Sequence, residues 1–265
     1  PARGKVPLFV YDTPESIWNE HRESTRGRDL DITGLSYAIL EHAGPQQWPF
    51  AVGASTGRKR LYEDGVFATP DGRARFAPAQ ARPTAEKRDA HYPFSLTTGR
   101  LRDQWHGASR TGTLGRLFGH VGEPVVDVHP SDLARLRLNV GDLVTLRSRR
   151  GTLVLPTAAS ESVAPAQLHV AMHWGSEFMA GQGVNALLPA AFCPTSKQPE
   201  LKHAAVKLAK AELPWRLAAR AWLAADIALT RRADALDLLR ELPYAVCVPF
   251  GREPDESVGL MIRAA

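Results

Sequence analysis

The most specific polar stretch of this sequence follows a short predicted strand. It consists of Thr98, Gly99, Arg100, Leu101, Arg102, Asp103, Gln104, Trp105, His106 and Gly107. A glycine at a strand end lets the backbone approach a ligand closely, and hydroxyls, freed N–H groups and a planar guanidinium can hold the oxygens of an anion. Trp105 adds a ring face and His106 a ring nitrogen. The stretch is therefore a candidate site for an anion that carries a heterocycle, although an ordinary loop can have the same composition.

Two isolated polar residues further along the chain suit the same kind of ligand. Asn185 has an amide that can both donate to and accept from a heterocycle edge, and Lys202 offers a point charge for an oxyanion. His173 ends a predicted strand just before Gly175, where a side chain can line a pocket or simply pack. Taken singly, Asn185 is equally a turn residue and Lys202 a surface lysine.

The net charge of +5 and the two cysteines exclude some classes of function. The arginines and lysines are scattered and are not interleaved with aromatic residues, which argues against a nucleic-acid partner. Cys193 and Cys247 are too few and too far apart for a zinc site or for the four thiolates of an iron–sulfur cluster. They also provide no disulfide framework, so we expect a reducing, cytoplasmic compartment.

The chain contains no run of about 18 apolar residues, so we expect neither a membrane span nor a membrane partner. The first residues also lack the basic and then apolar build of a secretory signal. Because Pro1 stands where an initiator Met would be, we interpret the sequence as part of a longer protein.

Several short strands and frequent turns characterise the middle of the chain. Strands are predicted at residues 93–97, 124–128, 143–148, 152–156 and 167–172, and a short helix begins at Pro130. The third and fourth strands form a hairpin. Without an alternation of strands and helices, this pattern predicts a mainly β fold, a compact β-barrel rather than a doubly wound sheet.

The flanking regions differ from the middle. Near the start we predict two short helices, at residues 17–23 and 35–41, followed by an irregular connecting arm, residues 44–93, with a short strand at 66–68. The tail is predicted as a small α+β addition. Trp215, Ala218, Ala219 and Trp222 would share one helical face, Leu236, Leu239 and Leu242 would lie on a second helix ended by Pro243, and strands at 244–250 and 258–262 would flank a turn at 251–257. The predicted domains are 1–92, 93–212 and 213–265.

Together these motifs resemble a known family. Residues 98–107, Gly141-Asp142, His173-Trp174, Asn185 and residues 199–203 follow one another as in the C-terminal molybdopterin-dinucleotide-binding domain of bacterial molybdenum oxidoreductases. The versions at residues 102–106 and 198–203 look most like the catalytic subunit of assimilatory nitrate reductases. Periplasmic nitrate reductases and formate dehydrogenases are close relatives. The resemblance extends to about residue 210 and does not cover the tail.

The resemblance implies a double-psi β-barrel that wraps one of the two dinucleotides holding molybdenum, in the form of bis-molybdopterin guanine dinucleotide. Residues 98–107 would line the pterin and diphosphate, Asn185 would hydrogen-bond the cofactor, and Lys202 would lie near a phosphate or pterin oxygen. The correspondence is looser for Arg110 and His173. In the family, the molybdenum ligand and a four-cysteine iron–sulfur site belong to the N-terminal portion. Neither cysteine matches them, and we interpret Cys193 as a packing residue.

The implied activity is the reduction of nitrate to nitrite by the full enzyme. This chain would contribute no catalytic and no metal-ligating residue and would be inactive alone. Its implied partners are the N-terminal remainder of the same enzyme and an electron-donor protein or domain. A formate dehydrogenase or another oxyanion reductase of the family is the alternative enzyme, and a non-catalytic double-psi barrel that acts as a binding module is the alternative of another class.

Overall fold

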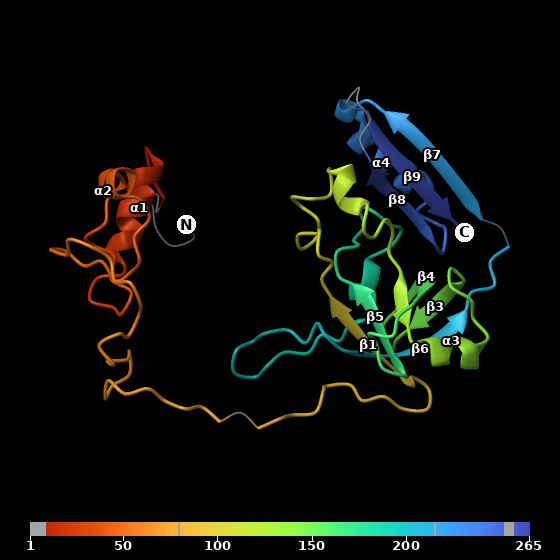
Figure 1. The fold of residues 1–265 in the computed structure, drawn as a ribbon, viewed down its shortest axis with the longest axis horizontal. Helices are drawn as coiled ribbons and strands as arrows, with labels where there is room; N and C mark the ends of the chain where they lie inside the picture. The colour runs from red at the N-terminus through yellow and green to blue at the C-terminus, as the bar shows by residue number, and fades with distance from the viewer. Residues whose placement is uncertain (1–8, 79, 215, 252–256) are drawn as a thin grey trace. The chain divides into compact units, whose positions relative to one another are not determined.

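A computed structural model describes residues 9–78, 80–214, 216–251 and 257–265 of the chain. The chain divides into two compact units, Pro1–Gln80 and Ala81–Ala265 (Figure 1). Among the described residues, no helix is both long enough and apolar enough to cross a membrane.

The first unit contains the two predicted helices, which confirms them. Helix α1 (Pro14–Glu23) begins at Thr13, whose side chain accepts a hydrogen bond from the Ser16 N–H while the Ser16 side chain bonds back, and Pro14 occupies the first turn. Helix α2 (Tyr37–Ala43) is capped by Ser36. A small apolar cluster joins the segments around them and consists of Ile32, Leu35 and Phe50, with Trp18, Ile39 and Leu40 packed against it.

The short strand predicted at residues 66–68 is wrong. This segment is irregular, and the backbone bonds of Phe67 are turn bonds: its N–H donates to the Gly72 carbonyl at 2.9 Å, and its carbonyl accepts the Thr69 N–H at 2.8 Å. The Phe67 ring instead stacks on Tyr62, with centroids 4.9 Å apart. Three residues with high strand propensity form a strand only where a second strand pairs with them, and no described strand pairs with residues 66–68.

The second unit contains a closed six-stranded barrel, which confirms the predicted fold class. Its strands are β1 (Phe94–Gly99), β2 (Val126–Val128), β3 (Leu143–Arg147), β4 (Thr152–Ala159), β5 (Gln167–Ala171) and β6 (Ala204–Lys210). They follow the order β1-β5-β2-β4-β3-β6, and β6 closes the barrel by pairing with β1 (Figure 1). The pairs β1/β5 and β2/β4 are parallel and the remaining pairs antiparallel, as suits a double-psi barrel.

Strand alternation explains how the barrel is filled. Along β1, Phe94, Leu96 and Thr98 point inward while the residues between them are more exposed. The other strands supply fully buried branched residues, which include Val126, Val144, Leu155, Leu168 and Val206. Helix α3 (Pro130–Leu136) starts with proline at its first position and follows β2 directly, as predicted.

Strand β6 was missing from the sequence prediction. Its sequence is rich in alanine and lysine, which are depleted in strands, so propensity gave little signal. Burial of Ala204, Ala205, Val206 and Leu208 and pairing on both edges determine its conformation. Without β6 the barrel would remain open between β1 and β3.

The tail forms a three-stranded sheet with one helix. Strands β7 (Leu217–Leu223), β8 (Ala245–Phe250) and β9 (Val258–Ala264) follow the order β7-β9-β8, and α4 (Ala225–Leu238) packs on β8 and β9. The strands β8 and β9 confirm two predictions. The turn predicted between them lies mostly outside the described residues.

Two helical predictions for the tail need correction. The helix predicted from the spacing of Ala218, Ala219 and Trp222 is wrong, because these residues lie on β7 and pair with β9 along seven positions. Trp215, the first residue of that pattern, lies outside the described residues. The second helix exists, but it ends at Leu238, so Leu239 and Leu242 lie beyond it.

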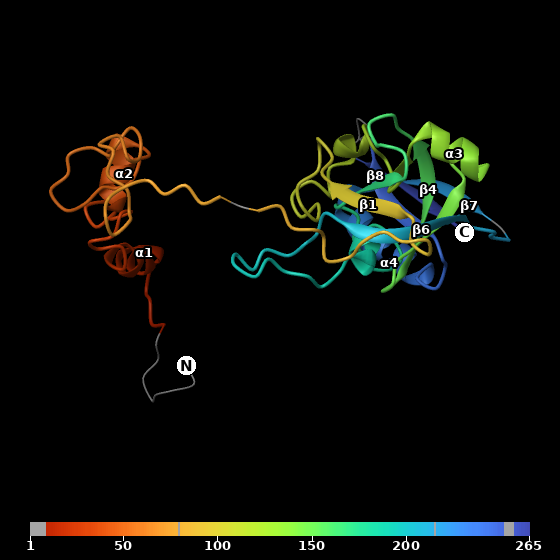
Figure 2. The same ribbon diagram turned by 90° about the horizontal axis from the view of Figure 1, so that it is seen from below.

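The tail packs directly against barrel loops within the second unit. The Tyr244 hydroxyl donates to Glu123 at 2.8 Å, Arg263 pairs with the same carboxylate, and Met179 forms a β-bridge with Val246. By contrast, the segment between the short 3-10 helix η2 (Gly183–Leu187) and β6 projects away from the barrel in two views (Figures 1 and 2).

An ion-pair network fastens the chain that enters the barrel. The Glu86 carboxylate pairs with Arg149 and Arg150 at 2.7 Å each and accepts the Ala205 N–H at 3.2 Å. Burial alone would raise the pKa of Glu86, but the hydrogen bonds from both arginines and from Ala205 outweigh it and lower the pKa from 4.5 to about 2. The carboxylate is therefore more acidic in the folded state than in the unfolded chain.

Glu86→Gln should lower the free energy of unfolding by about 3 kcal/mol at pH 7, since each pKa unit corresponds to about 1.4 kcal/mol. A depressed carboxylate stabilises the fold fully above its unfolded pKa and stops doing so as pH falls toward its folded pKa. The difference between wild type and variant should therefore shrink between about pH 4.5 and 2. Urea unfolding across this range measures it, with the exposed Glu161→Gln as control. A constant difference would contradict the assignment.

Candidate functional site

The end of strand β1 brings two of the predicted site residues together. Thr98 is only 8% exposed, and its hydroxyl donates to the Leu201 carbonyl at 2.6 Å. The Lys202 ammonium in turn lies 3.4 Å from the Thr98 carbonyl oxygen. Residues about a hundred positions apart in sequence therefore meet where the 98–107 loop leaves the barrel.

The His173 ring holds the 98–107 loop at two points. Its Nε2 accepts the Leu101 N–H at 2.8 Å, and its Nδ1 bonds to the His106 carbonyl oxygen. An N–H partner on one side and a carbonyl on the other require the neutral tautomer with hydrogen on Nδ1. Burial lowers the pKa of His173, the bond to His106 opposes this, and the nearby positive charge of Arg100 lowers it further. His173 therefore stays neutral near pH 7 and acts as a fixed strut.

Gly99 allows a second histidine to approach the same strand end. A Cβ at position 99 would lie 2.6 Å from Nε2 of His169, closer than real side chains come. The other ring nitrogen of His169 lies 2.8 Å from an oxygen of Asp127. Sequence reasoning missed this pair, although strand alternation places both residues on the barrel's outer face with Thr97 and could have suggested it.

The remaining residues of the loop divide into internal supports and exposed groups. The Gln104 side chain is 8% exposed, donates to the Leu117 carbonyl at 3.1 Å and accepts the Thr111 hydroxyl at 2.7 Å. Arg102 is engaged with Asp103 in an ion pair at 2.8 Å. The exposed residues of the loop besides Arg102 are Arg100, Trp105, His106 and Gly107, and the Arg110 guanidinium lies 5.3 Å from the Trp105 ring centroid.

Asn185 lies on a turn that packs around Trp174. It lies exposed on η2, whose first residue, Gly183, approaches the Trp174 carbonyl so closely that a Cβ would lie 2.0 Å from its oxygen. On the other side, Arg150 donates to the Leu187 carbonyl at 2.9 Å. Since Trp174 follows His173, Asn185 is carried by a turn anchored next to the strut of the 98–107 loop.

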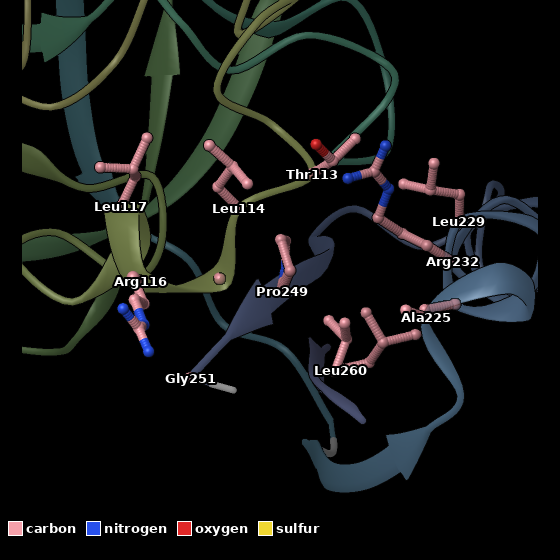
Figure 3. Close-up of a pocket in the computed structure, with 13 residues that line it drawn as sticks. Thr113, Leu114, Arg116, Leu117, Ala225, Leu229, Arg232, Pro249, Gly251 and Leu260 are labelled. Carbon is pink, nitrogen blue, oxygen red and sulfur yellow. The ribbon is translucent and has the colours of Figure 1, made fainter. Parts of the chain in front are cut away.

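A cavity of about 480 Å³ lies elsewhere, between the short 3-10 helix η1 (Gly115–Phe118) and the tail (Figure 3). Its walls are mainly apolar and include Leu114, Pro249 and Leu260. None of the residues predicted for the binding site lines it. The cavity therefore lies at the junction between barrel and tail and is separate from the predicted binding residues.

The interpretation of Cys193 as a packing residue is wrong. Its side chain is exposed on the projecting segment between η2 and β6. A hydrogen bond from the Ser196 side chain, with the N–H groups of Ser196 and Thr195, lowers the pKa of its thiol to about 7. Cys247 is the buried cysteine, and burial raises its pKa to about 11.

Comparison with known proteins identifies the barrel. A family model described as "Molydopterin dinucleotide binding domain" matches residues 94–205, the span from the start of β1 into β6. The barrel belongs to the molybdopterin dinucleotide-binding domain family. The match covers the 98–107 loop, Asn185 and Lys202, so every predicted site residue lies within the cofactor-binding domain.

Three relatives are particularly informative. A nitrate reductase of Klebsiella oxytoca is 36% identical over 223 residues, which are 81% of this chain and 25% of that protein. The assimilatory nitrate reductase catalytic subunit of Bacillus subtilis is 32% identical over 209 residues, which are 78% of this chain and 29% of that protein. A formate dehydrogenase alpha subunit of Methanocaldococcus jannaschii is 32% identical over 200 residues, which are 76% of this chain and 28% of that protein. The chain thus spans between a quarter and a third of the length of these relatives.

The exposed groups fit the chemistry of a pterin dinucleotide. The side chains of Arg100 and Asn185 are exposed and form no hydrogen bond or ion pair with any residue that the structure describes. A guanidinium and the Lys202 ammonium suit a diphosphate, and an amide suits the edge of a heterocycle. Gln104 and Thr98, by contrast, already use their side chains inside the protein.

His173→Phe should keep the ring volume but leave the Leu101 N–H and the His106 carbonyl without their partner. We expect the free energy of unfolding to fall by about 2 to 4 kcal/mol, measured by urea denaturation. The exposed His120→Phe is the control and should change it little. Equal effects of the two substitutions would show that the strut does not hold the loop.

Proposed function

We propose that this chain is the part of an assimilatory-type nitrate reductase that binds one molybdopterin guanine dinucleotide, and that the full enzyme reduces nitrate to nitrite. The observation that carries the proposal is the meeting of Thr98, Lys202 and the His173-held loop at one end of a barrel that matches the dinucleotide-binding family. Relatives named nitrate reductase, one of them assimilatory, support the activity.

The proposed roles follow from charge and shape. Arg100 and Lys202 neutralise the diphosphate, Asn185 reads a heterocycle edge, and the Trp105 ring offers an apolar face. When bound, the cofactor supplies the molybdenum that exchanges electrons with nitrate. The residues of this chain bind and orient the dinucleotide, and none of them is proposed to touch nitrate.

The wider setting of the enzyme belongs to the same proposal. We propose two dinucleotides around one molybdenum, an iron–sulfur cluster in an N-terminal remainder of the protein, and an electron-donor protein or domain. A cytoplasmic location fits an assimilatory enzyme. The division into an N-terminal region and arm to residue 92, the barrel from 93 to 212 and a tail from 213 to 265 also remains a prediction.

Lys202→Gln and Arg100→Gln in the full-length enzyme should each weaken retention of the dinucleotide by about tenfold, because each removes a positive charge that would neutralise the diphosphate. Molybdenum and released guanine nucleotide per polypeptide are measured after gel filtration. Lys207→Gln, which removes an exposed lysine from β6, should leave both unchanged. Normal cofactor content in the first two variants would favour the alternative of a non-catalytic barrel module.

The formate dehydrogenase relative makes formate oxidation the alternative activity within the family. Because a dinucleotide-binding domain contacts the cofactor rather than the substrate, the distinction requires an assay. The purified full-length enzyme should reduce nitrate with a chemical electron donor and should not oxidise formate with a chemical acceptor. The reverse result would assign it to the formate branch.

A further inference from the structure

Arg232 on helix α4 is a buried cation at the junction between tail and barrel. The residue is 8% exposed, its guanidinium donates to the Gly112 carbonyl at 2.8 Å, and it lies 4.5 Å from the ring centroid of Phe178. Burial lowers the pKa of this guanidinium, while the charge of Glu177 acts in the opposite direction. Removal of a guanidinium from water is costly, so the carbonyl and the ring must stay in place to offset it.

Gly112 belongs to a tight turn that continues the 98–107 loop. Its N–H donates to the Ala108 carbonyl at 2.7 Å, and the Ala108 N–H donates to the Trp105 carbonyl at 2.7 Å. The Thr111 hydroxyl, one position before Gly112, bonds to the buried Gln104 amide. A displacement of Gly112 would therefore be transmitted to Trp105 and Gln104.

Phe178, the other group that Arg232 contacts, is fixed by the tail as well. The Cys247 N–H of β8 donates to the Phe178 carbonyl at 2.9 Å, and the Ala180 N–H donates to the Ala245 carbonyl at 2.9 Å. The ring packs so closely on the turn that a Cβ at Gly112 would lie 2.6 Å from it. The Phe178 ring and the Gly112 turn are thus in contact, and the tail holds both of them: strand β8 bonds to Phe178, and Arg232 bonds to Gly112.

We propose that Arg232 is a positioning residue for the dinucleotide-binding loop, through which the tail keeps the 98–107 loop in its binding conformation. This inference rests on the proposed function. It gives a role to the tail, which lies beyond the residues that match the dinucleotide-binding domain. Figure 3 shows the guanidinium of Arg232 turned toward Thr113, directly after Gly112, at one side of the junction cavity.

The test compares Arg232→Met with Arg232→Lys in the full-length enzyme. Methionine keeps an unbranched apolar chain against Phe178 but cannot donate to the Gly112 carbonyl, whereas lysine restores a charged donor. Arg231→Met is the matched control, because Arg231 is its neighbour on α4, is exposed and pairs only with Asp234 among the described residues. The rate of dinucleotide loss is followed well below the unfolding temperature of every variant.

We expect Arg232→Met to lose the dinucleotide at least about tenfold faster than wild type, Arg232→Lys to recover most of this loss, and Arg231→Met to behave as wild type. A second readout is the rate of tryptic cleavage after the exposed Arg110 in the cofactor-free enzyme, which should rise only in Arg232→Met. If Arg232→Met cannot be purified with cofactor, the three proteins are compared by cleavage rate alone. The rate of Arg232→Lys should then lie between those of wild type and Arg232→Met.

Two results would overturn the inference. A lower unfolding temperature for Arg232→Met with unchanged rates of dinucleotide loss and of cleavage at Arg110 would make Arg232 a purely structural residue. Failure of lysine to restore either rate would do the same. Failure of the proposed function itself is distinguishable, because wild-type enzyme and Arg231→Met would then also contain no dinucleotide.

Discussion

The neutral His173 ring is the constraint on which the conformation of the 98–107 loop depends. It is buried at the end of β5 and satisfies an N–H and a carbonyl on opposite sides of the 98–107 loop. A protonated ring would have two donors and would lose the bond from Leu101, while burial disfavours that charged form. This one ring connects the end of a barrel strand to a loop that has no strand pairing of its own, and so fixes the position of the loop relative to the barrel.

The barrel itself determines which segments can meet at that loop. Because β6 closes on β1, the residues before β6 lie beside the end of β1, and Lys202 arrives next to Thr98. The parallel pairing of β1 with β5 places His169 beside Gly99 and His173 just past the strand end. The site is therefore a consequence of strand order rather than of any contiguous motif.

Charge is distributed differently in the binding region and in the scaffold. Glu86 and two arginines neutralise one another where the chain enters the barrel, and Glu123 takes a hydrogen bond and an ion pair from the tail. Among the residues that the structure describes, Arg100 has no such partner, and the Lys202 ammonium bonds only to the Thr98 carbonyl. Positive charge left without a carboxylate at one end of the barrel is what an anionic dinucleotide requires.

The sequence alone determined the barrel class, most strand positions and the composition of the 98–107 loop, because alternation, turn residues and glycine positions are local properties. Local patterns were ambiguous at β6 and β7, where alanine-rich segments become strands only by pairing with distant partners. Tertiary structure decided that Gln104 supports the 98–107 loop from inside and that Cys193 is exposed. It also decided that His169 approaches Gly99 and that Arg232 bonds to the Gly112 carbonyl just after the loop. These outcomes depend on contacts between residues far apart in the chain, which no local pattern records.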